Sequence, residues 1–114
     1  MTPSQKPQDG GAAIKWKDAT SYSQGQYGRI DPTAWECVIE GIRIWVSCGH
    51  RYYPGEWVVT CLPLGIDCKQ IGKIENLSAD HARALALGFV SAAARKQAGT
   101  LEKLASRIDE GPQP

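Results

Sequence analysis

The strongest constraint on the fold is a two-residue alternation of side-chain character that runs from Trp35 to Cys48. This period is typical of β-strands that bury one face, because successive side chains point to opposite sides of a strand. Glu40-Gly41 interrupts the run and predicts a hairpin turn, although Glu is not the usual first residue of such a turn. A slip of one residue would mix glutamates with isoleucines, so the pattern also predicts its own register. The side chains expected to face inward are Trp35, Cys37, Ile39, Ile42, Ile44, Val46 and Cys48.

Two more strands are expected after this hairpin, one over residues 57–61 and a short one over residues 66–68. Tyr53-Pro54-Gly55-Glu56 and Leu64-Gly65 carry turn chemistry and separate these strands from their neighbours. If both loops are symmetric, each strand continues the inner face of the one before it. The sequence therefore predicts an antiparallel meander with one apolar face.

That apolar face needs a cover, which the C-terminal third supplies. Ser78 is expected to cap a helix that begins at Ala79, with Asp80 near the positive end of the helix dipole. Gly99 interrupts the helical pattern, and Thr100 is a candidate cap for a second helix, so one kinked helix and two helices both remain open. The expected packing stripe is Ala82, Leu85, Ala86, Phe89 and Ala93. The predicted fold class is α+β: a three- or four-stranded antiparallel meander with one face covered by one or two C-terminal helices.

The chain has 114 residues, enough for one domain with a modest core. Its 13 basic and 12 acidic residues are evenly spread, so no strong field of either sign is expected. No apolar stretch resembles a signal peptide or a membrane span, and a cytoplasmic location is therefore expected. The predicted organisation is a disordered tail at 1–13, a single domain at 14–110 and a second tail at 111–114. Within the domain, an ordered loop or edge strand (14–34) precedes the sheet (35–71) and the helices (78–109).

Three thiols are expected in one row, because symmetric loops place Cys48 opposite Cys61 and Cys61 opposite Cys68. With His50 further along the same face, they superficially form a three-sulfur, one-nitrogen zinc set. Structural zinc sites usually use tight Cys-x2-Cys turns, whereas these side chains point in parallel from strands, so core packing is favoured over metal or disulfide. Cys48-Gly49-His50 also suggests a nucleophile and its base, but residues two apart on a strand lie about 6.6–7 Å apart. Neither a cofactor nor an enzymatic activity is predicted.

The opposite, outer face carries the candidate binding surface. Trp45 is its most informative member, since a large aromatic among charges usually covers or binds something. One hypothesis is that residues 14–34 fold over this face and that Trp16 or Tyr22 packs on Trp45. The others are protein binding, which favours Trp, Tyr and Arg, and nucleic-acid binding, which interspersed acids oppose. The candidate binding residues are Arg43, Trp45, Arg51, Tyr53 and Lys69, and the acids among them are Glu36, Glu40, Glu56 and Asp67.

Two resemblances bear on function. Three strands followed by a packed helix resemble the AP2-like DNA-binding domains of phage integrases, which implies DNA reading by Arg43, Trp45, Arg51 and Lys69. The stretch from Trp16 to Ser23, followed by Trp35, Trp57 and Leu64-Gly65-Ile66-Asp67, resembles small bacteriophage and prophage proteins over residues 16–71. That resemblance implies a protein that binds a host protein and blocks host defence, including CRISPR interference. The leading hypothesis is a non-enzymatic, phage-encoded module that binds and inhibits a host protein.

Overall fold

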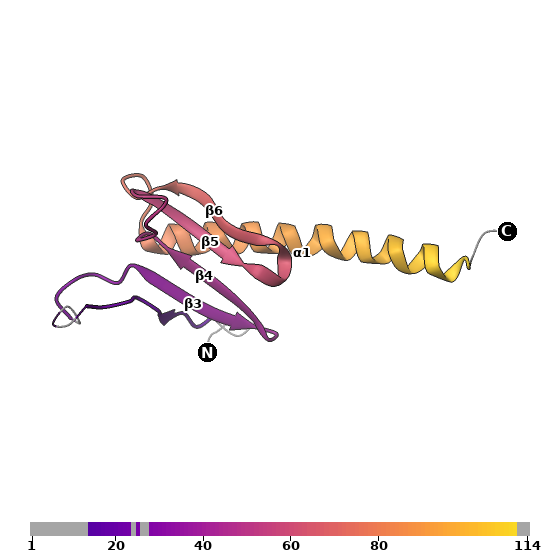
Figure 1. Cartoon of the computed structure of the whole chain (residues 1–114), viewed down its shortest axis with the longest axis horizontal. Coiled ribbons are helices and arrows are strands. Elements are labelled where there is room, and N and C mark those ends of the chain that lie inside the picture. Colours follow the sequence, from indigo (N-terminus) through magenta and orange to yellow (C-terminus); the bar gives the residue numbers. More distant parts are fainter. Residues whose placement is uncertain (1–13, 24, 26–27, 112–114) are drawn as a thin grey trace, which may run out of the picture.

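The computed structural model describes residues 14–23, 25 and 28–111. It confirms the α+β class as a five-stranded antiparallel open sheet with one C-terminal helix (Figure 1). In sheet order the strands are β2 (Lys17–Asp18), β3 (Ala34–Ile39), β4 (Ile42–Ser47), β5 (Glu56–Cys61) and β6 (Ile66–Lys73). A short 3₁₀ turn, η1 (Leu62–Leu64), joins the last two strands, and α1 (Ala79–Asp109) follows them. Of the two expected tails, residues 1–13 and 112–114 lie outside the described residues.

The central hairpin forms as its alternation predicts. Trp35 pairs with Val46 and Cys37 pairs with Ile44, so the apolar side chains of β3 and β4 share one face. The connecting turn holds both of its central residues at positive φ, 53° at Glu40 and 78° at Gly41. This is the backbone that a two-residue hairpin of matching twist requires.

The described residues of the 14–34 segment contribute a short edge strand beside β3. In β2, Lys17 pairs with Glu36 and Asp18 pairs with Trp35, which adds a fifth strand beside β3. The hydroxyl of Thr20 accepts hydrogen bonds from the backbone N–H groups of the 33–34 segment. Trp16 packs against the buried cluster, and the hypothesis that it covers Trp45 is therefore wrong.

The helix α1 is a single uninterrupted element of 31 residues. The hydroxyl of Ser78 accepts the backbone N–H of His81 at 3.2 Å, and Asp80 lies in the first turn, which confirms the predicted cap. Gly99 does not break the helix. Thr100 is not a cap, because its hydroxyl donates to the carbonyl oxygen of Lys96 one turn earlier within the same helix. Within the described residues, no helix is both long and apolar enough to cross a membrane.

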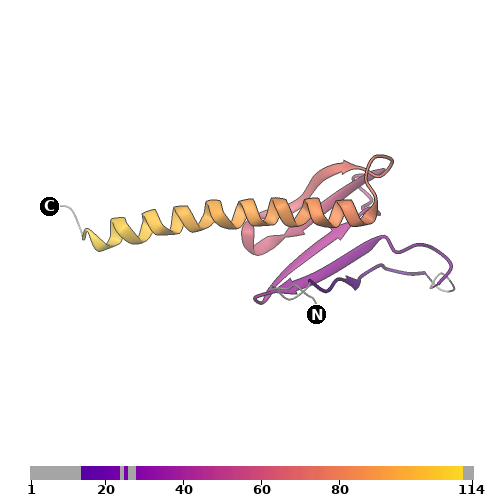
Figure 2. The ribbon, with the colours of Figure 1, turned by 180° about the vertical axis from the view of Figure 1, so that it is seen from behind.

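The core lies between α1 and one face of the sheet. Val46, Val59 and Cys61 are fully buried on the sheet side, and Ala82 and Ala86 meet them with no exposed surface. Small alanine side chains allow the helix to approach the sheet closely. The described part of α1 after Ala93 is exposed, and it projects beyond the sheet (Figures 1 and 2). Of the predicted stripe, Leu85 is 40% exposed, and Val90 is buried instead.

The registers on either side of β5 differ from the prediction. Cys48 does not lie opposite Cys61, because Val46 pairs with Val59 and the connection after β4 is a long loop with two successive turns. Cys61 pairs with Ile66 instead of Cys68. The loop after Cys61 is a 3₁₀ turn closed by Gly65 at φ 74°, which is longer than the expected two-residue turn.

A bulge in β6 changes which side chains face the core. The pairing of β5 with β6 shifts between Val59 and Cys61, and Cys68 adopts a φ of 51°. An extra residue in one strand reverses the facing of every side chain that follows it. Cys68 accordingly points to the outer face, and Lys69 turns to the helix side. The predicted row of three thiols is therefore wrong.

Candidate functional site

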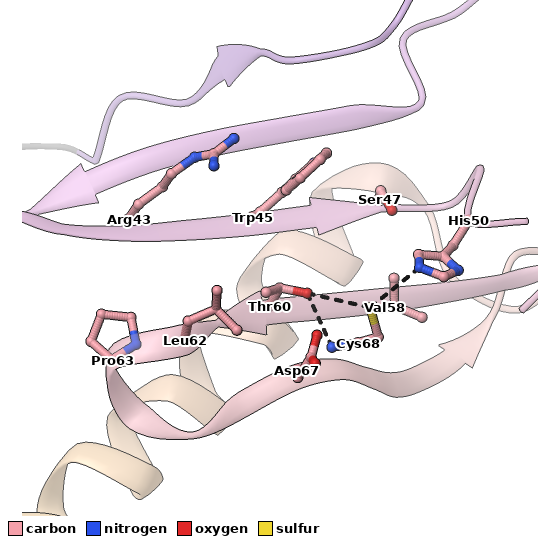
Figure 3. A pocket seen from close by; sticks show the side chains of 10 residues that line it. All are labelled: Arg43, Trp45, Ser47, His50, Val58, Thr60, Leu62, Pro63, Asp67 and Cys68. Atoms are coloured by element: carbon pink, nitrogen blue, oxygen red, sulfur yellow. Dashed lines mark hydrogen bonds between the residues drawn. The ribbon is translucent and has the colours of Figure 1, made fainter. Parts of the chain in front are cut away.

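The outer face of β4, β5 and β6 forms a groove of about 470 Å³. It lies on the side of the sheet opposite α1 (Figure 3), and α1 contributes none of its lining residues. The strands supply its walls and floor, and the 3₁₀ turn η1 supplies one end. Its lining residues are Arg43, Trp45, Ser47, His50, Val58, Thr60, Leu62, Pro63, Asp67 and Cys68.

Trp45 is the largest apolar group of this groove and remains 38% exposed. The guanidinium carbon of Arg43 lies 4.8 Å from the centre of its ring, within the range of a cation–π contact. The same guanidinium forms a 3.1 Å ion pair with Glu36 on the neighbouring strand. These two contacts hold the Arg43 side chain between β3 and β4, where it covers one side of the Trp45 indole.

The structure brings together only part of the predicted binding set. Arg43 and Trp45 line the groove, as the alternation predicts. Arg51 lies on the loop after β4, with its guanidinium carbon 5.9 Å from the ring centre of Tyr52, and it does not line the groove. Tyr53 lies against His50, with the two ring centres 5.1 Å apart and the rings inclined at 45°. It does not line the groove beside Trp45. The prediction that Lys69 lies on the outer face is wrong. Its ammonium nitrogen lies 5.0 Å from the ring centre of Phe89 on α1, which covers the opposite face.

The alternative zinc set of four side chains is not assembled. Cys61 is fully buried on the inner face and Cys48 packs against the same cluster, whereas Cys68 and His50 line the outer groove. No group of three or more His, Cys, Asp or Glu side chains in the described residues is placed to hold a metal ion. The Cys48–His50 pair, which strand spacing disfavoured, does not form, since His50 contacts the thiol of Cys68 instead.

The thiol of Cys68 lies 3.3 Å from the Nε2 atom of His50 at one wall of the groove (Figure 3). The hydroxyl of Thr60 accepts the backbone N–H of Cys68 at 3.1 Å and directs its own hydrogen to Sγ at 3.8 Å. The bulge of β6 creates this cluster, because it turns Cys68 out of the core. Two neighbouring strands, β5 and β6, and the loop after β4 thus meet at one sulfur atom.

Hydrogen bonding assigns the tautomer of His50. The backbone N–H of Tyr52 donates to Nδ1 at 3.2 Å, so Nδ1 is an acceptor and carries no proton. The proton of a neutral imidazole then resides on Nε2. Nε2 therefore donates to the sulfur of Cys68, which receives two donors, one from His50 and one from Thr60.

The charges of the groove are unevenly compensated. Glu36 neutralises Arg43, whereas Asp67 forms no ion pair among the described residues. His50 is neutral in the tautomer above. The groove consequently presents an apolar surface with one uncompensated carboxylate, a combination that suits a ligand with both apolar and basic groups.

Six members of the groove were not predicted as site residues, although Asp67 was expected on this face as an acid: Ser47, Val58, Thr60, Leu62, Pro63 and Asp67. The alternation does place Thr60 on the outer face of β5, and this signal was available in the sequence. Leu62 is 66% exposed beside Pro63 in the 3₁₀ turn, where no periodicity indicates a direction. Comparison with protein-family models, with curated proteins and with solved structures gives no match for this chain.

Proposed function

We propose that the protein is a non-enzymatic binding module that engages a protein partner through the outer groove. The observation that carries this proposal is the exposed indole of Trp45 beside a groove of about 470 Å³ on the face that α1 leaves open. Trp and Arg are the residues most often found at the energetic centres of protein interfaces. Arg43 adds rigidity, since its stacking on Trp45 and its pairing with Glu36 reduce the entropy lost on binding.

The charge distribution favours protein over nucleic acid as the ligand. A nucleic-acid surface needs cations that are free to neutralise phosphates. Here Arg43 is paired with Glu36, and Lys69 lies against Phe89 on the helix side. Asp67 adds a negative charge inside the groove and would repel a phosphate backbone.

The same features define the partner's chemistry. An apolar side chain would pack between Trp45 and the Leu62-Pro63 turn, and a lysine or arginine beside it would pair with Asp67. The groove volume falls within the range of sites that bury small ligands or a few side chains, about 300–1,000 Å³. We therefore infer a short extended segment of a protein as the ligand.

The class of partner follows from the resemblance to small bacteriophage proteins over residues 16–71. On that basis the segment belongs to a host protein, with a component of host defence as the first class to test, and the module acts in the host cytoplasm. Its effect would be inhibition by occupancy, since binding to the groove requires no chemical step.

The direct test is selection of a random displayed-peptide library on the immobilised full-length protein. Selected peptides are expected to combine an apolar residue with a neighbouring Lys or Arg. Trp45→Ala should weaken their binding about thirtyfold or more, because truncating a hot-spot residue, a class enriched in Trp, costs about 2 kcal/mol or more. Asp67→Asn should weaken it several-fold, and this loss should shrink at high salt.

Leu104→Ala is the matched control, since Leu104 is a 54% exposed apolar residue on the projecting part of α1. It should leave peptide affinity unchanged. Equal binding by wild type and Trp45→Ala would contradict the proposal. So would tight binding of a DNA or RNA oligonucleotide that falls steeply with salt, which would favour the nucleic-acid alternative.

A further inference from the structure

We propose that Cys68 is a thiol-modification site that takes a low-molecular-weight disulfide with an amino group, with His50 and Thr60 holding the attacking sulfur. The site lies in the outer groove but needs no protein partner. Its chemistry therefore stands apart from the binding function proposed above.

The geometry distinguishes Cys68 from an isolated surface cysteine. Its Sγ receives the Nε2–H of His50 at 3.3 Å and the hydroxyl of Thr60 at 3.8 Å. Hydrogen bonds to a charged sulfur are stronger than those to a neutral thiol, so both donors stabilise the negative charge on the sulfur as it attacks a disulfide. Because Tyr52 fixes the tautomer of His50, Nε2 acts as a donor and not as the base that removes the thiol proton.

The backbone also directs this side chain into the groove. Cys68 is a non-glycine residue at φ 51°, a conformation that L-residues rarely adopt. The bulge that imposes this φ places the side chain in the groove, where a small molecule has access. Strain of this kind is concentrated at functional sites in proteins.

The other three thiols lie in or against the core: Cys37 and Cys61 are buried, and Cys48 is partly buried. Cys37 and Cys61 are 3% and 0% exposed, and Cys48 packs against the same core cluster. Burial raises the pKa of all three thiols above the ordinary value of 9.0, which disfavours their thiolates. Selective reaction at Cys68 is thus expected within a chain that has four free cysteines.

The reaction is a single thiol–disulfide exchange. The proton of Cys68 passes to solvent, and its thiolate attacks one sulfur of a disulfide RS–SR. The Cys68–SR bond forms as the RS–SR bond breaks, and RS⁻ leaves. The disulfide is the oxidant, so no further redox partner is needed.

The neighbouring carboxylate selects the class of disulfide. Asp67 lines the same groove, precedes Cys68 in the chain and forms no ion pair among the described residues. Coulomb attraction raises the local concentration of cations and lowers that of anions near such a group. A cationic disulfide such as cystamine should therefore react faster than an anionic one such as oxidised glutathione, relative to their rates with a free model thiol.

The experiment treats the full-length reduced protein with cystamine near neutral pH and follows intact mass and peptide maps over time. The first adduct is expected at Cys68, at least about tenfold faster than at Cys48, the matched control with intermediate exposure. Cys68→Ser should abolish the fast phase and Cys48→Ser should retain it. Modification of another cysteine first would overturn the proposal.

His50→Phe tests the positioning donor, because it keeps an aromatic ring beside Tyr53 but removes Nε2. We expect the Cys68 rate to fall about three- to tenfold, since hydrogen bonds to charged groups are stronger than neutral ones and part of that gain is offset by lower nucleophilicity. Thr60→Val should slow the reaction through the second donor. Unchanged rates in both variants would refute the assigned roles. Asp67→Asn should remove the preference for cystamine over oxidised glutathione.

A Cys68 adduct would occupy the groove beside Trp45, so on the function proposed above it would block the partner. This consequence rests on that function, and the exchange itself does not. If the adduct forms but selected peptides bind equally well before and after its formation, the result supports Cys68 as the modification site and contradicts control of partner binding by the adduct. If no adduct forms while peptides bind through Trp45, the binding function stands alone.

Discussion

The indole N–H of Trp57 donates a 3.0 Å hydrogen bond to the carbonyl oxygen of Leu77, twenty residues later in the chain. Trp57 is 4% exposed, and Leu77 immediately precedes the residue that caps α1. This bond therefore connects β5 to the point where the helix begins. It fixes the start of α1 over the inner face.

Trp57→Phe should destabilise the fold by about 1–3 kcal/mol, because it leaves the Leu77 carbonyl without its donor and removes part of a buried ring. Urea unfolding followed by far-UV circular dichroism measures this change. Trp45→Phe is the control and should change the free energy of unfolding by about 0.5 kcal/mol or less, since Trp45 lies on the outer face. Equal losses in the two variants would contradict the assigned role of the Trp57 bond.

Two glycine substitutions should act in opposite directions. A Cβ at Gly72 would collide with the side chain of Leu77, and its φ of 156° is unfavourable for other residues. Gly72→Ala should cost about 1–3 kcal/mol. Gly99→Ala should stabilise the projecting part of α1 locally by up to about 1 kcal/mol, because Gly99 lies inside α1 with open space around it. Thermal unfolding measures the loss in Gly72→Ala, and amide exchange around position 99 measures the local gain in Gly99→Ala. A stabilising Gly72→Ala would contradict the packing at β6.

Alkaline pH should weaken the fold through its buried thiols. Burial raises the pKa of Cys37, Cys48 and Cys61 above 9.0, so the unfolded chain loses protons that the folded chain retains. The stability from this difference is complete below the unfolded pKa and is lost as pH rises through the folded pKa. Urea titrations at about pH 8 and about pH 10 should show a fall in the free energy of unfolding, and this fall should be smaller in Cys61→Ala than in the wild type. An identical pH dependence in both proteins would exclude the Cys61 thiol as a cause.

The projecting part of α1 should be dispensable for the sheet. The last buried residue of the helix is Val90, and Ala93 is the last that packs against the core. Ending the chain after Gly99 should change the unfolding of the sheet, measured by tryptophan fluorescence, by about 0.5 kcal/mol or less. Ending it after Leu85 removes Ala86 and Val90 and should prevent folding. If the chain that ends after Gly99 were unfolded, the distal part of α1 would be shown to stabilise the domain.

Local chemistry made parts of this fold predictable. The alternation from Trp35 to Cys48 correctly places Cys37, Ile44 and Val46 inside and Trp45 outside, because a strand with one buried face has a single acceptable register. The Ser78 cap was equally readable, since side-chain capping depends on residues only three apart. Both signals are contained within a few residues of the chain.

The candidate site was harder to predict because it depends on backbone irregularity. The bulge at Cys68 leaves no trace in the alternation, yet it exchanges the facing of Cys68 and Lys69. The loop after Ser47 has two successive turns where a single symmetric turn was expected, and this brings His50 to the outer groove. Loop length and bulge position are set by tertiary packing, which periodicity does not report.

The length of α1 has a practical consequence for its carboxyl end. At 1.5 Å per residue, the stretch from Ala93 to Asp109 carries that end about 24 Å past the last turn that rests on the domain. A fluorophore or a fused domain attached there would stand well clear of both sheet faces. The amide protons in the projecting part of α1 should exchange with solvent by end fraying, whereas those in the first turns should exchange only on global unfolding. Amide-exchange lifetimes should therefore differ greatly between the two ends of one helix.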